Sequence, residues 1–115
     1  MAASRNPRAR LLHIRDEIEG VAATLDGVEY DAFRASYTLR RTTERALQII
    51  SEAAKALPPD YQARYPKAPW KAIIALGNIL RHEYQRVEDS ILWEIATIHL
   101  PNLRPVIEQL LSEEM

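Results

Sequence analysis

The helical spacing of apolar residues between Trp70 and Tyr84 constrains the fold more than any other sequence feature. This stretch reads WKAIIALGNILRHEY and contains no proline. At about 100° per residue, its apolar residues gather on one side of a helix. They are Ala72, Ile73, Leu76, Ile79 and Leu80. The residues on roughly the opposite side are Asn78, Arg81, His82 and Gln85, with Gly77 and Tyr84 near the border. We therefore predict a helix with one face in the core and a polar cluster on the other.

The remainder of the chain carries the same periodicity, interrupted by prolines and by one Asp-Gly pair. A first helix is expected over residues 8–25, because Asp26-Gly27 then ends it. A second is expected from Asp31, as the cap, to about Leu57, where Pro58-Pro59 stops it. The segment 58–69 holds four prolines and is expected to be a loop with a short helical turn around 61–64.

The C-terminal part predicts three further helical pieces. Pro69 can open the third helix, which we expect to end near 85–87. A fourth helix is expected over 91–99, capped by Asp89 or Ser90, with a break or kink at Pro101 and Pro105 before a last piece at 103–111. No strand pattern is visible. The fold class predicted is all-α, an antiparallel bundle of four to five helices.

Size and composition narrow the function classes. The 115 residues predict one domain, 1–115, with a loose start at 1–7. The net charge of −1 does not indicate a nucleic-acid binder, so that role requires a local basic patch. The absence of cysteine excludes disulfides and thiolate chemistry. No apolar run approaches the ~18 residues of a membrane helix, and the first ten residues lack the core of a signal peptide. We expect a cytoplasmic protein without membrane contact.

His82 is the strongest candidate for catalysis. An imidazole exchanges protons near neutral pH, as general acid–base catalysis requires. No metal constellation is visible in the sequence, and we expect neither a metal site nor a cofactor. The alternative is a structural or surface histidine. On the second helix, Arg41 and Arg45 lie one turn apart, which fits either a solvated face or a phosphate-binding strip. Trp70 and Trp93 are interpreted as packing residues.

Several ordered segments resemble the HepT-like proteins of the HEPN superfamily of helical domains. That family's motif is Arg, four residues, His, one residue, Tyr, and Asn78, His82 and Tyr84 match its end. PW at 69–70, VEDSILWEI at 87–95, LPNLRPVIEQLL at 100–111 and RALQIISEAAKAL at 45–57 also match. The resemblance begins at about Phe33.

The resemblance implies a metal-independent ribonuclease, the toxin of a toxin–antitoxin pair, that acts as a homodimer with RNA bound in a shared cleft. The family's Arg holds the scissile phosphate and its His transfers protons. Carried over, these roles imply that His82 is catalytic and that Asn78 orients the substrate. The partner implied is a minimal nucleotidyltransferase antitoxin, which adenylylates the motif Tyr, here Tyr84. Arg41 and Arg45 are the additional phosphate-binding candidates.

The sequence departs from the family at the motif Arg, whose place is taken by Gly77. Losing such a donor costs roughly 10²–10³ in rate. Arg81, four residues on, can substitute, because helical side chains lean toward the N-terminus. Alternatively, Gly77 allows two copies of this helix to approach across a dimer axis, or the nuclease is weakened or lost. The rival functions are a non-catalytic dimer that binds a nucleotide, RNA or a nucleotidyltransferase, and a purely structural helical dimer. A Gly77→Arg variant is expected to separate an active enzyme from one that has lost its nuclease.

Overall fold

The computed structural model describes residues 6–114, and all the regular structure in that range is helical. The predicted all-α class is therefore confirmed. The expected loose start lies mainly outside the described residues, although Pro7 already belongs to the first helix. The elements are α1 (Pro7–Thr24), α2 (Tyr30–Ala35), α3 (Tyr37–Lys55), α4 (Pro59–Arg64), α5 (Trp70–Glu83), a 3₁₀ turn (Tyr84–Arg86), α6 (Asp89–Glu94), a π-helical segment (Ile95–His99) and α7 (Leu100–Glu113).

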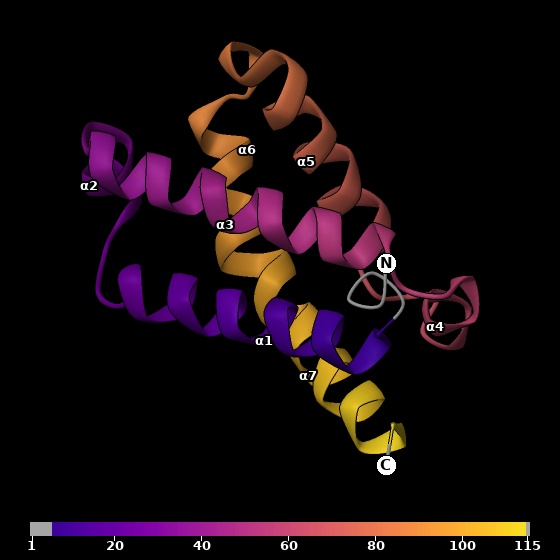
Figure 1. Ribbon diagram of the computed structural model, residues 1–115. Helices are drawn as coiled ribbons and strands as arrows, with labels where there is room; N and C mark the ends of the chain where they lie inside the picture. The colour runs from indigo at the N-terminus through magenta and orange to yellow at the C-terminus, as the bar shows by residue number, and fades with distance from the viewer. Residues whose placement is uncertain (1–5, 115) are drawn as a thin grey trace.

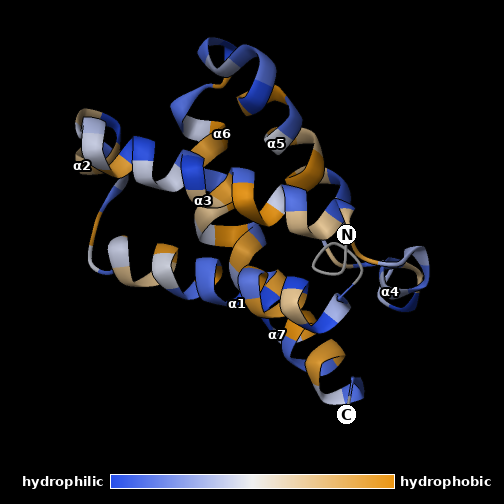
Figure 2. Ribbon diagram, viewed as in Figure 1, coloured by the Kyte–Doolittle hydropathy of each residue, from blue (hydrophilic) through white to orange (hydrophobic). Residues whose placement is uncertain are grey.

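Helix α3 is the centre of the bundle. It packs against α1 on one side and α5 on the other, while α6 passes behind it and α7 packs against α1 (Figure 1). The apolar residues of α3 and α7 gather where the helices meet (Figure 2). The largest fully buried side chains are Leu11, Ile14, Phe33, Leu47, Ile50, Ile73, Leu80, Leu92, Leu100, Leu103, Ile107 and Leu110. Burial of this shared core fixes α3 and α5 side by side, and the candidate site lies on their outer surface.

The single second helix predicted over 31–57 was wrong, because the chain breaks at Ser36. Ser36 is extended (φ −104°, ψ 111°), and its hydroxyl oxygen accepts a hydrogen bond from the Leu39 amide at 3.1 Å. This is an N-cap, which a serine readily provides. The break lets α2 bury Phe33, whose ring lies 5.1 Å from that of Trp93. An unbroken helix would have put α2 in line with α3, away from Trp93.

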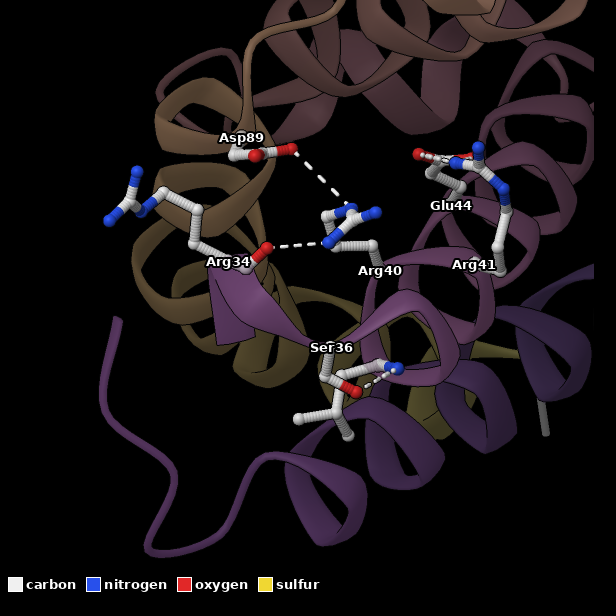
Figure 3. A network of polar contacts seen from close by, with 7 residues as sticks. Arg34, Ser36, Arg40, Arg41, Glu44 and Asp89 are labelled. Atoms are coloured by element: carbon white, nitrogen blue, oxygen red, sulfur yellow. Dashed lines mark hydrogen bonds and ion pairs between the residues drawn. The ribbon is translucent and has the colours of Figure 1, made fainter. Parts of the chain in front are cut away.

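Arg40 stabilises this break. Its guanidinium donates a hydrogen bond to the carbonyl oxygen of Arg34 and lies 3.8 Å from the Asp89 carboxylate (Figure 3). One side chain therefore joins the end of α2, the start of α3 and the start of α6.

We predicted a break or kink before the last helix, and the structure shows no break there. Residues 89–113 form consecutive helical segments, and the π-helical stretch Ile95–His99 ends two residues before Pro101. A proline ring clashes with the carbonyl four residues earlier, here that of Thr97, and a π-helical turn widens the helix at such a point. We infer that the wider turn accommodates Pro101 without ending the helix.

Three local predictions were wrong: the N-cap residues of α2 and α6 are Glu29 and Glu88, and Ile79, expected in the core, is exposed. Other predicted features agree with the structure. The short turn expected in the proline-rich segment is α4. Trp70 is buried, and its indole N–H donates to the Tyr65 carbonyl oxygen at 3.0 Å. Within residues 6–114, no helix combines the length and apolar character needed to cross a bilayer.

Candidate nucleic-acid interface

Helix α5 exposes the polar residues that its sequence pattern placed opposite the core. Arg81 and His82 are exposed and Asn78 is half-buried, whereas Ile73, Leu76 and Leu80 are buried. Gly77, which the pattern placed near the border, is fully inside and faces α3. Tyr84 follows α5 in the 3₁₀ turn and is 58% exposed. The helix thus presents Asn78, Arg81 and His82 to the surface, while Gly77 belongs to the packing.

Gly77 permits the close approach of α5 to α3. A Cβ built on Gly77 would overlap both Cβ and Oγ of Ser51, a fully buried residue of α3. The Ser51 hydroxyl donates to the Ile74 carbonyl oxygen at 3.3 Å, which joins the two helices at this point. The close contact that Gly77 allows therefore lies within one chain. The interpretation of Gly77 as a dimer-axis contact is wrong, because α3 already fills that space.

Arg81 reaches across the surface from α5 to α3. Its guanidinium forms an ion pair with Glu52 and donates to Asn78 Oδ1 at 2.8 Å. The Lys55 ammonium donates to the same Asn78 oxygen at 3.3 Å. Asn78 therefore links two cations, one from each helix. Arg81 lies on the α3 side of α5, as its role in place of the motif Arg requires. Its positive charge is, however, already paired with the Glu52 carboxylate.

A surface hollow of about 390 Å³ lies beside this cluster. Its lining residues are Arg45, Gln48, Glu52, Lys55 and Arg81. A second hollow of about 300 Å³ shares Arg45 and Gln48 with the first. Its other lining residues are Arg41, Glu44, Leu80 and Tyr84. We call the two hollows together the α3–α5 groove.

Arg41 organises the second half of the α3–α5 groove. It forms an ion pair with Glu44 at 2.8 Å, and its guanidinium carbon lies 5.0 Å from the Tyr37 ring centre and 5.8 Å from that of Tyr84. The attraction of the Glu44 charge and a hydrogen bond with Tyr37 raise the pKa of Arg41 above its ordinary value. Arg41 therefore stays protonated throughout the physiological range.

The groove is basic although the whole chain is not. Arg41, Arg45, Lys55 and Arg81 line it or border it, against the two carboxylates of Glu44 and Glu52. The hydrogen bond from Arg45 to Gln48 is long, at 3.5 Å, and the Arg41 side chain is half-exposed. Both arginines are therefore accessible to a ligand. This excess of cations provides the local patch that a nucleic-acid role requires.

His82 lies beside the groove and does not line it. It is one residue beyond Arg81, so its side chain leaves α5 about 100° further round the helix. Its side chain is exposed and makes no hydrogen bond among the described residues. The structure thus brings Arg41, Arg45, Arg81 and Tyr84 to one groove and leaves His82 at its edge. The sequence interpretation missed Tyr37 and Lys55, although both continue the strip of α3 at i, i+3 and i, i+4 spacing that contains Arg41. Within residues 6–114, no three His, Asp or Glu side chains cluster so as to hold a metal ion.

The fold and the site define a small all-helical domain with a basic surface groove beside an exposed histidine. Residues 14–110 match the family model "Ribonuclease HepT-like", and the chain belongs to this family. This confirms the resemblance stated from the sequence.

Curated relatives agree with this assignment. A protein named "Putative RNase" from Caldanaerobacter subterraneus subsp. tengcongensis is 34% identical over 110 residues, covering 96% of this chain and 98% of the relative. A Methanocaldococcus jannaschii protein of the same description is 29% identical over 106 residues, covering 92% and 97% of the two chains. "Probable ribonuclease HepT" from Thermococcus cleftensis is 27% identical over 103 residues, covering 84% and 94%. No solved structure gives a significant match.

Proposed function

We propose that this protein is a metal-independent endoribonuclease, the toxin of a toxin–antitoxin pair, acting as a homodimer in the cytoplasm. The observation that carries the proposal is the basic α3–α5 groove, with Arg81 on its wall and His82 at its edge. The family and the names of its relatives support a ribonuclease. In the proposed homodimer, a second copy would add its own basic groove and histidine to a shared cleft.

The chemistry follows from these side chains. His82 removes the proton of a 2′-hydroxyl, whose oxygen attacks the adjacent phosphorus. The bond from phosphorus to the 5′-oxygen of the next nucleotide breaks, the leaving oxygen takes a proton from water, and the His82 imidazolium returns its proton to the solvent. Arg81 stabilises the negative charge that develops on the phosphoryl oxygens. Asn78 holds the Arg81 guanidinium by accepting its hydrogen bond. Arg41 and Arg45 bind the flanking phosphates and fix the register of the strand.

Replacing Arg81 by Ala tests the phosphate-binding role. We expect kcat/KM for RNA cleavage to fall by about 10²-fold, because a charged donor to the developing anion is lost. The matched control is Arg104→Ala, which removes an exposed arginine that pairs with Glu19 at 2.8 Å on α1, away from the groove. The control should retain nearly full activity. Equal rates for the two variants would contradict the role given to Arg81.

A non-catalytic RNA- or nucleotide-binding dimer is the second candidate. Two observations favour it: Arg81 is already paired with Glu52, and position 77 has no space for the family's arginine. In that case the groove binds RNA with a salt dependence typical of phosphate contacts but leaves it intact. Intact RNA after prolonged incubation with a chain that binds it would favour this candidate.

A minimal nucleotidyltransferase is the partner that we propose for Tyr84. Its ring is exposed, and its hydroxyl is accessible for transfer of an AMP group. An attached AMP phosphate beside Arg41 would occupy a cation otherwise available to RNA. Co-expression with such an enzyme should add whole AMP units to the mass of the natural chain.

The Tyr84→Phe variant should show no such addition. Tyr37→Phe is the matched control, since Tyr37 is even more exposed and lies near the same arginine. Retained modification of Tyr84→Phe would show that another residue is the acceptor.

A further inference from the structure

Tyr37 is an exposed aromatic side chain that the proposed reaction does not use. Its exposed fraction is 66%, the highest among the large apolar and aromatic residues described as exposed. It is the first residue of α3, directly after the Ser36 cap. Because α3 has no turn before Tyr37, no earlier side chain of that helix shields the ring. A large aromatic group in such a position is available to a ligand.

The surroundings hold Tyr37 in a defined place. Ser36 caps α3, and Arg40 secures the break through the Arg34 carbonyl oxygen and Asp89 (Figure 3). Arg41, one turn further on, places its guanidinium 5.0 Å from the Tyr37 ring centre, within the range of a cation–π interaction. A ring that is held in place but exposed loses little conformational entropy when a ligand stacks on it.

The position of Tyr37 relates it to the α3–α5 groove. Arg41 joins the ring to the groove, because the same guanidinium lies 5.8 Å from the Tyr84 ring centre, and both Arg41 and Tyr84 line the second hollow. Arg45 follows one further turn along α3, about 12 Å from Tyr37 by helical rise. A strand whose phosphates contact Arg41 and Arg45 would therefore bring an adjacent base to Tyr37.

We propose that Tyr37 is a base-stacking site for single-stranded RNA at the end of the α3–α5 groove. The inference rests on the proposed function, because it assumes that RNA occupies this groove. Unstacked bases commonly lie on exposed aromatic rings, a contact that tolerates any base sequence. Arg41 would contribute twice, by binding a phosphate and by orienting the ring. The site therefore selects single-stranded over double-stranded RNA, whose bases are already stacked.

The test measures binding and not cleavage. The probe is a fluorescent single-stranded oligoribonucleotide with 2′-O-methyl groups, which cannot be cleaved by 2′-hydroxyl attack. We expect Tyr37→Ala to weaken its binding by about 5- to 100-fold, the range found for loss of one base–aromatic stack. Tyr37→Phe, which keeps the ring, should bind within about twofold of the natural chain. The salt dependence of binding should not change, because no charge is removed.

Two controls separate stacking from other roles of the ring. Ile98→Ala removes an exposed apolar side chain from the π-helical segment and should not affect binding. An abasic version of the probe keeps the phosphates, and Tyr37→Ala should bind it as the natural chain does. Equal weakening on both probes would show that Tyr37 acts only by orienting Arg41, which would overturn the proposal.

Three other outcomes would also decide whether Tyr37 is a base-stacking site. Binding of the intact probe within twofold of the natural chain by Tyr37→Ala would refute the stacking site while leaving the proposed function standing. A change from dimer to monomer in sedimentation of Tyr37→Ala, with weakened binding, would assign the ring to contact between chains and overturn the proposal. A natural chain that binds no RNA would refute both the stacking site and the proposed function.

Discussion

Adding one methyl group at position 77 should destabilise the whole fold. Gly77→Ala places a Cβ where Ser51 of α3 already lies, so α3 and α5 must move apart along their shared core. We expect the free energy of unfolding to fall by about 1–3 kcal/mol, as for other overpacked cores. The sign of this change in the free energy of unfolding is informative, because replacing glycine by alanine at an unhindered helix position raises stability by about 1 kcal/mol. Urea unfolding followed by circular dichroism measures the change.

Two further variants complete this experiment. Gly20→Ala is the matched control, since Gly20 lies inside α1 with nothing within 4 Å of the added Cβ, and it should raise stability. Ser51→Gly removes the atoms that the new methyl group meets, leaving the Ser51 Cα at an ordinary 3.6 Å. The double variant Ser51→Gly with Gly77→Ala should therefore lose much less stability than the sum of the single changes. Additive losses would show that the clash lies elsewhere.

The clash between a Cβ at position 77 and Ser51 also changes how the result of a Gly77→Arg variant must be interpreted. An arginine at position 77 begins with the same Cβ and would have to displace α3 before its guanidinium could reach the groove. We therefore expect it to unfold the chain or lower its stability at least as much as alanine. Failure of this variant to gain activity would not show that the natural chain lacks activity.

Replacing His82 by alanine should nearly abolish RNA cleavage. General acid–base catalysis contributes about 10²–10⁴ in rate, and His82 is the histidine at the edge of the basic groove. The fold should not suffer, because the side chain is exposed and its described surroundings provide no hydrogen bond that the substitution would break. Initial rates on a short RNA under single-turnover conditions measure the loss.

His13→Ala is the matched control for this variant. His13 is also exposed but lies on α1, which packs on the opposite side of α3 from α5. Its loss should leave the rate within about twofold. RNA binding by His82→Ala should also stay near that of the natural chain, since the cations of the groove remain. A rate that falls equally in both variants would point to a general effect on the protein.

The sequence predicted those features of the fold that depend on nearby residues. The exposed face of α5 followed from the spacing of Ile73, Leu76 and Leu80, because helical periodicity is a local property. The break at Ser36 did not follow, because a serine is compatible with both a cap and a helix interior. The contact between Phe33 and Trp93, far apart in the chain, decided between them. The π-helical turn before Pro101 likewise depends on keeping Leu92 and Leu103 in one core.

The candidate site likewise has features that could be predicted from the sequence and features that could not. Arg41 and Arg45 could be identified as a strip from their spacing on one helix. The surroundings of Gly77 and Arg81 could not, since Ser51 and Glu52 approach them from α3 through the antiparallel packing of two helices. The interpretation of Gly77 as a lost catalytic position considered only its own helix. The exposure of Tyr37 could not be predicted, since it depends on the break at Ser36, which makes Tyr37 the first residue of α3.

The most direct test of the proposed function is the analysis of RNA products formed by the purified natural chain in excess chelator. The proposed chemistry predicts cleavage without added metal and 5′ fragments that end in a 2′,3′-cyclic phosphate, since the 2′-oxygen is the nucleophile. It also predicts that His82→Ala forms almost none of these products. Cleavage that requires a divalent cation, fragments without cyclic phosphate ends, or equal product formation by His82→Ala would contradict it.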